Sequence, residues 1–107
     1  MGIHWYRMDR FDPAVFDWDV GNISHIAKHD VTTVEAEQVV LGAPVMLDVE
    51  ERNGEDRHTE LGQTAAGRLL LVVWTGRQGK IRVVTAFPAN RKWRAVWHRL
   101  SGTTPVV

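Results

Sequence analysis

The sequence predicts an α+β domain of the order α-α-β-β-β-β-α, in which helices pack on a four-stranded antiparallel meander sheet. Two observations support this prediction. Residues 68–87 hold two β-rich runs on either side of a short loop that Gly76 and Gly79 bracket, which is typical of an antiparallel hairpin. Residues 20–41 and 90–100, before and after the strands, instead repeat apolar side chains at helical spacing.

Length and composition exclude several classes of protein. The 107 residues suit one domain, with loose ends expected at residues 1–13 and 101–107. The chain has no cysteine, which excludes disulfides, thiolate metal sites and cysteine nucleophiles. No apolar run approaches membrane-spanning length and no signal-peptide core is present, so we expect a cytoplasmic protein without membrane contact. There is no Walker loop, dinucleotide fingerprint or nucleophile elbow, and we expect no cofactor.

The net charge of +0 conceals an uneven distribution. Residues 1–56 hold 4 Lys and Arg against 12 Asp and Glu, whereas residues 57–107 hold 9 against 1. If the basic half keeps one open face, that face suits an anion, for which RNA is a natural candidate. The alternative is a solvated surface on which the two halves balance each other.

The first helix is expected over about residues 20–28. Asp17 or Asp19 can cap it, because a short carboxylate accepts hydrogen bonds from the free N–H groups of the first turn. His25 and His29 stand four residues apart on this helix, a spacing that can hold a metal ion. No Asp, Glu or Cys at ligand spacing completes such a set, so we expect no metal and interpret His25 as a hydrogen-bonded packing residue near the sheet.

The second helix is expected over residues 32–41. Thr32 and Glu35 fit a capping box, in which each side chain satisfies a backbone N–H of the other residue. Gly42 suits the left-handed position after the helix end, and Pro44 cannot continue the helix.

Four strands follow in a meander, which is the simplest path through such short loops. The first covers residues 45–51 and the second residues 56–64, and the Asn53-Gly54 pair between them is a strong hairpin signal. Residues 65–67 then turn the chain into the central hairpin of residues 68–87.

The register of the central hairpin follows from its expected loop. If Thr75 lies opposite Lys80, then Val73 lies opposite Arg82, and side-chain alternation puts both cations on one face of the sheet. The other face then carries the core residues Leu70, Val72, Trp74, Ile81, Val83 and Thr85. Extending the meander by one strand places Arg57 on the same face as the two cations.

Arg57 and Arg82 would lie two strands apart on that face, with backbones about 10 Å from each other. Two guanidinium groups at that distance can converge on one phosphate, because the planar fork of arginine matches phosphate oxygens. They can also stabilise the charge that develops when an RNA phosphodiester is attacked. His29 or Lys28 could reach the same face and transfer a proton. The alternative is that each arginine pairs with an acid such as Glu50, Glu51 or Glu60.

Short stretches spread over about residues 16–97 form an ordered set. They are Phe16-Asp17-Trp18-Asp19, Asn22, His25, Ile26, Lys28-His29, Val31, Glu35-Ala36-Glu37, Leu61-Gly62, Thr64, Gly67-Arg68, residues 81–86 and Arg91-Lys92. In this order and spacing the set resembles the BrnT family of RelE-like ribonuclease toxins from type II toxin–antitoxin systems.

The resemblance implies a toxin that cuts mRNA without a metal, through the RNA 2′-hydroxyl, and that a small cognate antitoxin protein holds inactive. By position it assigns the catalytic site to Lys28, His29, Arg57 and Arg82. We expect further RNA contacts at the nearby cations Arg77, Lys80, Arg91 and Arg94. The expected assembly is a homodimer or a toxin–antitoxin heteromer.

The chain departs from the family pattern near its last strand and helix. Phe87-Pro88 stand where the family usually has an arginine and a polar residue, Trp93 stands at the place of a glutamate, and Trp97 at that of a tyrosine. Losing an arginine and a glutamate weakens phosphate binding and proton transfer. A second interpretation is therefore a weakened or inactive family member that serves as a protein-binding module. A third is a metal-dependent enzyme that uses His25 and His29.

Overall fold

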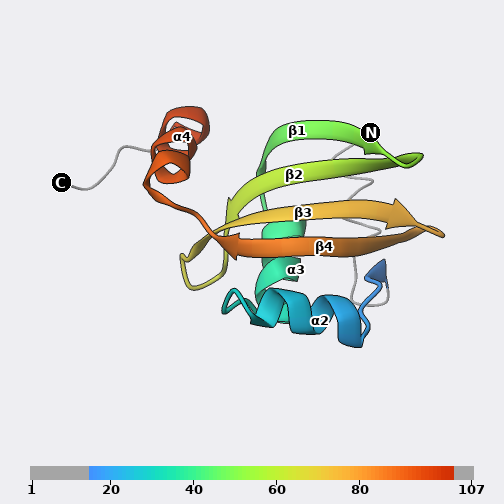
Figure 1. Cartoon of the computed structure of the whole chain (residues 1–107). Helices are drawn as coiled ribbons and strands as arrows, with labels where there is room; N and C mark the ends of the chain where they lie inside the picture. Colours follow the sequence, from blue (N-terminus) through green and yellow to red (C-terminus); the bar gives the residue numbers. More distant parts are fainter. Residues whose placement is uncertain (1–14, 103–107) are drawn as a thin grey trace.

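The computed structural model describes residues 15–102, where three α-helices and a 4-stranded antiparallel sheet follow the predicted order α-α-β-β-β-β-α (Figure 1). The predicted α+β fold class is confirmed. The elements are α2 (Val20–Ala27), α3 (Thr33–Leu41), β1 (Val45–Arg52), β2 (Glu55–Gln63), β3 (Leu69–Arg77), β4 (Lys80–Pro88) and α4 (Arg91–Ser101). The loose ends expected at 1–13 and 103–107 lie outside the described residues, whereas Ser101 belongs to α4.

α2 is capped by Asp19, one of the two predicted caps, and is attached to the edge of β4. The Asp19 carboxylate accepts a hydrogen bond from the backbone N–H of Asn22, and the Asn22 side chain accepts one from the N–H of Asp19. The amide group of Asn22 also donates to the backbone carbonyl of Val83 on β4, at 3.1 Å. Just before the helix, the N–H of Asp17 donates to the carbonyl of Ile81 at 2.8 Å. These contacts hold the start of α2 beside the start of β4.

α3 begins with the predicted capping box of Thr32 and Glu35 and packs its apolar side into the core through Ala36, Val39 and Val40. The prediction for Gly42 is wrong, because its φ is −80° rather than a left-handed value. Glycine is required there for a different reason. A Cβ atom at this position would lie 2.9 Å from the backbone oxygen of Gln38.

The sheet is the predicted meander, in the order β1-β2-β3-β4. Its first and last hairpins turn through Asn53-Gly54 and Gln78-Gly79, and all of these residues have positive φ, as in two-residue type I′ turns. The loop predicted for the central hairpin is therefore two residues too long. As a result, Thr75 lies opposite Arg82 and not opposite Lys80.

An extra residue in β4 changes which side chains face the core. Val84 has no partner on β3, which makes a β-bulge. The alternation shifts by one residue after the bulge, so Ala86 and not the predicted Thr85 joins the core. The other predicted core residues do lie in that core or pack against it: Leu70, Val72, Trp74, Ile81 and Val83.

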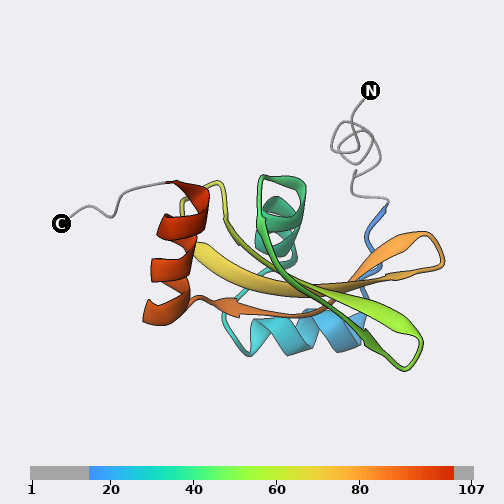
Figure 2. The same ribbon diagram turned by 90° about the horizontal axis from the view of Figure 1, so that it is seen from above.

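The helices cover the two faces of the sheet unequally (Figure 1). Residues of α2 and α3 form one core with β3 and β4, which includes Ile26 and Val72. α4 crosses the other face near one end of the sheet, where Trp97 packs in a core with Leu61 (Figure 2). No described helix covers the opposite end of that face, where two hairpins turn. The candidate site lies at this open end.

Candidate functional site

Arg57, Thr75 and Arg82 form one row across β2, β3 and β4. Each lies directly opposite the next in the strand register, and directly opposed residues point to the same face. The error of two residues in the predicted hairpin register does not separate the arginines, because side chains alternate with a period of two. Arg57 and Arg82 therefore share one face of the sheet.

An open hollow of about 320 Å³ lies beside this row, and we call it the arginine pocket. Its walls come from α2 and from β2, β3 and β4. The lining residues are Gly21, Asn22, His25, Arg57, Arg77, Arg82, Val83 and Val84. Three guanidinium groups and one imidazole share this space, which suits an anion such as a phosphate.

Arg82 is paired with two carboxylates. Its Nη1 lies 3.0 Å from Oδ2 of Asp19 and 3.5 Å from Oδ2 of Asp17. The hydrogen bond between Arg82 and Asp19 raises the pKa of Arg82 and lowers the pKa of Asp19. Pairing with an acid is the alternative that the sequence left open for both arginines. Arg82 does pair with acids, but these are Asp17 and Asp19. The acids expected from the sequence were Glu50, Glu51 or Glu60.

Arg57 differs from Arg82 because it has no ion pair with any residue in the range 15–102. Glu50 lies opposite Arg57 in the register, but the Glu50 carboxylate contacts Arg52 at 3.5 Å. The Nε of Arg57 is buried and has no hydrogen-bond partner in this part of the chain. A buried donor without a partner is destabilising, and such groups in native proteins usually have an explanation. An anion in the arginine pocket would be a partner for this guanidinium.

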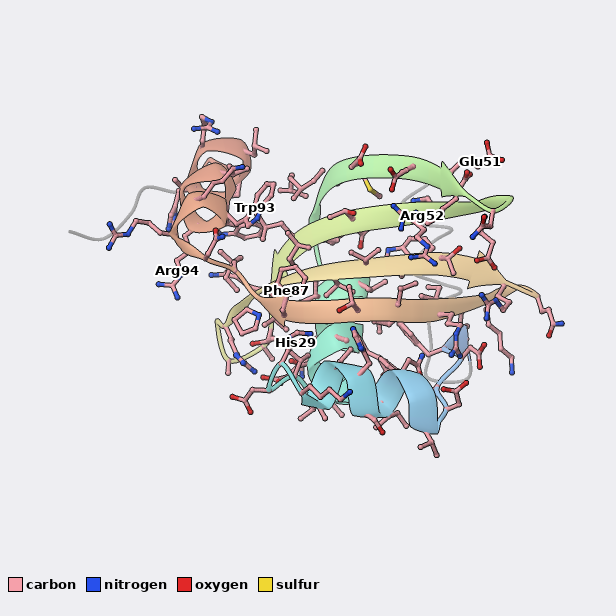
Figure 3. The ribbon with its side chains drawn as sticks, viewed as in Figure 1. His29, Glu51, Arg52, Phe87, Trp93 and Arg94 are labelled. Atoms are coloured by element: carbon pink, nitrogen blue, oxygen red, sulfur yellow. The ribbon has the colours of Figure 1, made fainter. Side chains whose placement is uncertain are left out.

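The residues expected to make further RNA contacts are divided between the two ends of the sheet. Arg77 lines the arginine pocket but donates two hydrogen bonds to Glu55, at 3.1 and 3.2 Å. Lys80 lies opposite Arg77 beside the hairpin turn and is exposed. Figure 3 shows Arg94 on α4, far along the sheet from the hairpin turns, and Arg91 begins the same helix.

His25, and not His29, lines the arginine pocket. Its Nε2 lies 3.1 Å from Oγ1 of Thr85 on β4, which confirms the expected hydrogen bond near the sheet, but His25 is exposed and not the packing residue that we expected. The ring of His29 lies next to those of His25 and Phe87, with centroids 5.4 and 5.9 Å away. Lys28 follows α2 as its C-cap and is exposed.

Sequence reasoning therefore missed one pocket histidine and two carboxylates. The sequence places Asn22 and His25 on one helix face, since they are three residues apart, but only the structure shows that this face meets β4, through the hydrogen bond from Asn22. No signal in the sequence marks Asp17 and Asp19 as partners of Arg82. An ion pair between distant parts of a chain follows from packing, and local sequence does not encode it.

Within residues 15–102, no group of three or more His, Cys, Asp or Glu side chains is placed to hold a metal ion. His25 and His29 thus have no third such ligand in the described part of the chain. Among the helices described there, none is long and apolar enough to cross a membrane.

One protein-family model matches most of the described chain. The family model described as "Ribonuclease toxin, BrnT, of type II toxin-antitoxin system" matches residues 18–92. The matched range includes α2, α3, all four strands and every residue that lines the arginine pocket. Comparison with individual curated proteins finds no match. The chain therefore belongs to the BrnT family of ribonuclease toxins of type II toxin–antitoxin systems.

Proposed function

We propose that this protein cuts messenger RNA by a metal-independent reaction of the RNA 2′-hydroxyl, and that a cognate antitoxin protein neutralises it in a toxin–antitoxin complex in the cytoplasm. Membership of the family supports the class of ribonuclease toxin. The observation that best supports the chemistry is the row of Arg57 and Arg82 beside the arginine pocket. One of these arginines, Arg57, has no carboxylate partner among the described residues.

In this proposal the two arginines bind the phosphate that is cut. Their backbones are two strand spacings apart, about 10 Å, and only the short side chain of Thr75 stands between them. The guanidinium of Arg57 donates to one phosphate oxygen. Arg82 donates to another by giving up one of its carboxylate contacts. Positive charge in this position stabilises the additional negative charge that the phosphate oxygens carry in the transition state.

The reaction also needs a proton acceptor and a proton donor. The 2′-oxygen attacks the adjacent phosphorus and loses its proton, the bond from phosphorus to the 5′-oxygen breaks, and that oxygen gains a proton. The products carry a 2′,3′-cyclic phosphate and a 5′-hydroxyl. We assign one proton transfer to His25, because it lines the pocket and an imidazole ring can both accept and donate a proton. The other transfer falls to water, or to Lys28 or His29, which follow the end of the same helix.

Cutting of RNA by the purified protein in the presence of EDTA tests the proposal. We expect products with 2′,3′-cyclic phosphate ends. Arg57→Ala should slow cutting by about a hundredfold or more, because loss of one positioned transition-state donor has an effect of this size. Arg99→Ala, which removes the same charge from the exposed last turn of α4, should cut like the wild type. Undiminished cutting by Arg57→Ala, or activity that EDTA abolishes, would contradict the proposal.

The pairing of Arg82 with Asp17 and Asp19 favours a second candidate function, in which the protein binds the antitoxin without cutting RNA. Two carboxylates beside one of the two arginines oppose the binding of a phosphate. A folded protein that binds the antitoxin but leaves RNA intact would support this function and reject the first.

A further inference from the structure

Three rings form a row that leads out of the arginine pocket. His25 lines the pocket, the ring centroid of His29 is 5.4 Å from that of His25, and the ring centroid of Phe87 is 5.9 Å from that of His29. We call His25, His29 and Phe87 the ring row. It connects the end of α2 with the end of β4, and Figure 3 shows Phe87 between His29 and Trp93.

Phe87 packs against a core, but part of its surface is exposed to solvent. It lies opposite Leu71 in the register and packs against the core beneath α4, but it is still partly exposed. His29 beside it is exposed. Farther along, the ammonium group of Lys92 lies 5.1 Å from the ring of Trp93. Rings that are exposed or partly exposed thus lie between a pocket rich in arginine and another cation.

We propose that the ring row stacks a base of the RNA strand whose phosphate is held by Arg57 and Arg82; this proposal rests on the proposed ribonuclease function. Flat rings beside guanidinium groups suit a ligand that alternates π-faces with negative charges, which describes single-stranded RNA. Phe87 follows Arg82 by five positions in β4, about 16 Å at the usual rise per residue. The stacked base therefore belongs to a nucleotide farther along the RNA strand and not to the nucleotides joined by the phosphate that is cut.

The ring row adds a property that the arginines lack. Contacts to phosphate position RNA but do not read its sequence, whereas contacts to bases can. The core contacts of Phe87 already restrict its ring, so a base that stacks on it orders little additional structure. The ring nitrogens of His29 can in addition form hydrogen bonds with the edge of that base. The ring row is thus a subsite that affects which sequences are cut.

Binding of a short single-stranded RNA with fluorine in place of every 2′-hydroxyl tests the subsite, because this RNA cannot be cut through that group. One nucleotide at a time is made abasic, and affinity is measured by fluorescence anisotropy. At one position the missing base should weaken binding to the wild type on the order of tenfold, the size expected for one base stacked on an aromatic side chain. Phe87→Leu should show almost no such loss there, whereas Phe87→Tyr, which keeps a ring, should retain it.

His29→Ala provides a second variant for the case in which Phe87→Leu fails to fold, since His29 is exposed and lies outside both cores. In His29→Ala, the missing base should weaken RNA binding less than it does in the wild type. Equal losses in the wild type and in the folded variants at every position would overturn the subsite, while cutting of unmodified RNA by the wild type would still support the ribonuclease. A wild type that neither binds nor cuts RNA would overturn both proposals. If Phe87→Leu weakens only the antitoxin complex, the ring row is a protein contact and the base assignment is wrong.

Discussion

Asp17→Asn should raise the affinity of the protein for RNA, because it removes one of two carboxylates that compete with phosphate for Arg82. The Asp17 carboxylate lies 3.5 Å from Nη1 of Arg82, and the two side chains are 35% and 19% exposed. The substitution retains the backbone contacts of residue 17, whose N–H donates to Ile81 and whose carbonyl accepts from Asn22. Asp19 is less suitable for this test, because its carboxylate also caps α2.

The size of the effect follows from the exposure of the pair. Two unit charges about 4 Å apart attract each other by about 4 kcal/mol at an effective dielectric constant of about 20. Partly exposed pairs retain only about 0–1 kcal/mol of this after desolvation and the ordering of side chains. With Arg82 mostly covered, we take the upper end of that range, about 1 kcal/mol, which corresponds to about fivefold tighter binding of RNA.

The assay is fluorescence anisotropy with the 2′-fluoro RNA at low salt, where charges are screened least. Glu51→Gln is the matched control, because it removes the same charge from an exposed position on β1 (Figure 3). We expect a clear gain for Asp17→Asn and little for Glu51→Gln. Equal gains would show an effect of net charge alone. A loss of affinity in Asp17→Asn would refute the competition and make this carboxylate a support that orients Arg82.

Three further predictions concern the proposed chemistry and the fold. His25→Ala should slow RNA cutting by about a hundredfold or more, since a general acid or base acts on the chemical step, and should weaken the binding of 2′-fluoro RNA by no more than about tenfold, the size expected for one stacked ring; a wild-type rate would assign the proton transfer to another group. Glu35 should stabilise the fold less in acid, because the hydrogen bond from the backbone N–H of Thr32, followed by that from Arg68, lowers the pKa of its carboxyl group. A lowered pKa in the folded state adds stability that is complete above the unfolded-state pKa of about 4.3 and is lost as the pH falls through the folded-state pKa. In urea unfolding, the difference in free energy of unfolding between the wild type and Glu35→Gln should therefore shrink below about pH 4, and a constant difference would contradict this cause. Ile26→Ala should lower the free energy of unfolding by about 2–5 kcal/mol, because Ile26 is 0% exposed in the core; a loss of less than about 1 kcal/mol in the same assay would show that α2 is not packed as described.

Local signals were sufficient to predict the order of the elements but not the register of the central hairpin. The Asn53-Gly54 turn was predicted because Asn and Gly are the residues that mark type I′ turns. Gln78 adopts a φ of 54° in the corresponding turn, and glutamine gives no such signal. The bulge at Val84 likewise has no signature in the sequence. The prediction that Arg57 and Arg82 share one face still holds, because an error of two residues in the register keeps every side chain on its face.

The contents of the arginine pocket depend on how α2 is attached to the sheet. Asp17 and Asp19 were both predicted as possible helix caps, and the position of the helix beside β4 brings both to Arg82. The choice between His25 and His29 has the same origin. Both follow from the sequence as residues of one helix face, but only the helix position on β4 decides which of them meets the arginines. Side-chain type and spacing predict candidates, and packing selects among them.

The central claim is that Arg57 and Arg82 bind one phosphate together. NMR of the arginine Nε–H groups during titration with 2′-fluoro RNA tests this claim most directly, because the Nε of Arg57 has no hydrogen-bond partner in the described part of the chain. We expect the resonances of Arg57 and Arg82 to shift together with a single dissociation constant, while that of Arg99 stays in place. RNA binding that leaves the Arg57 resonance unmoved would contradict the claim.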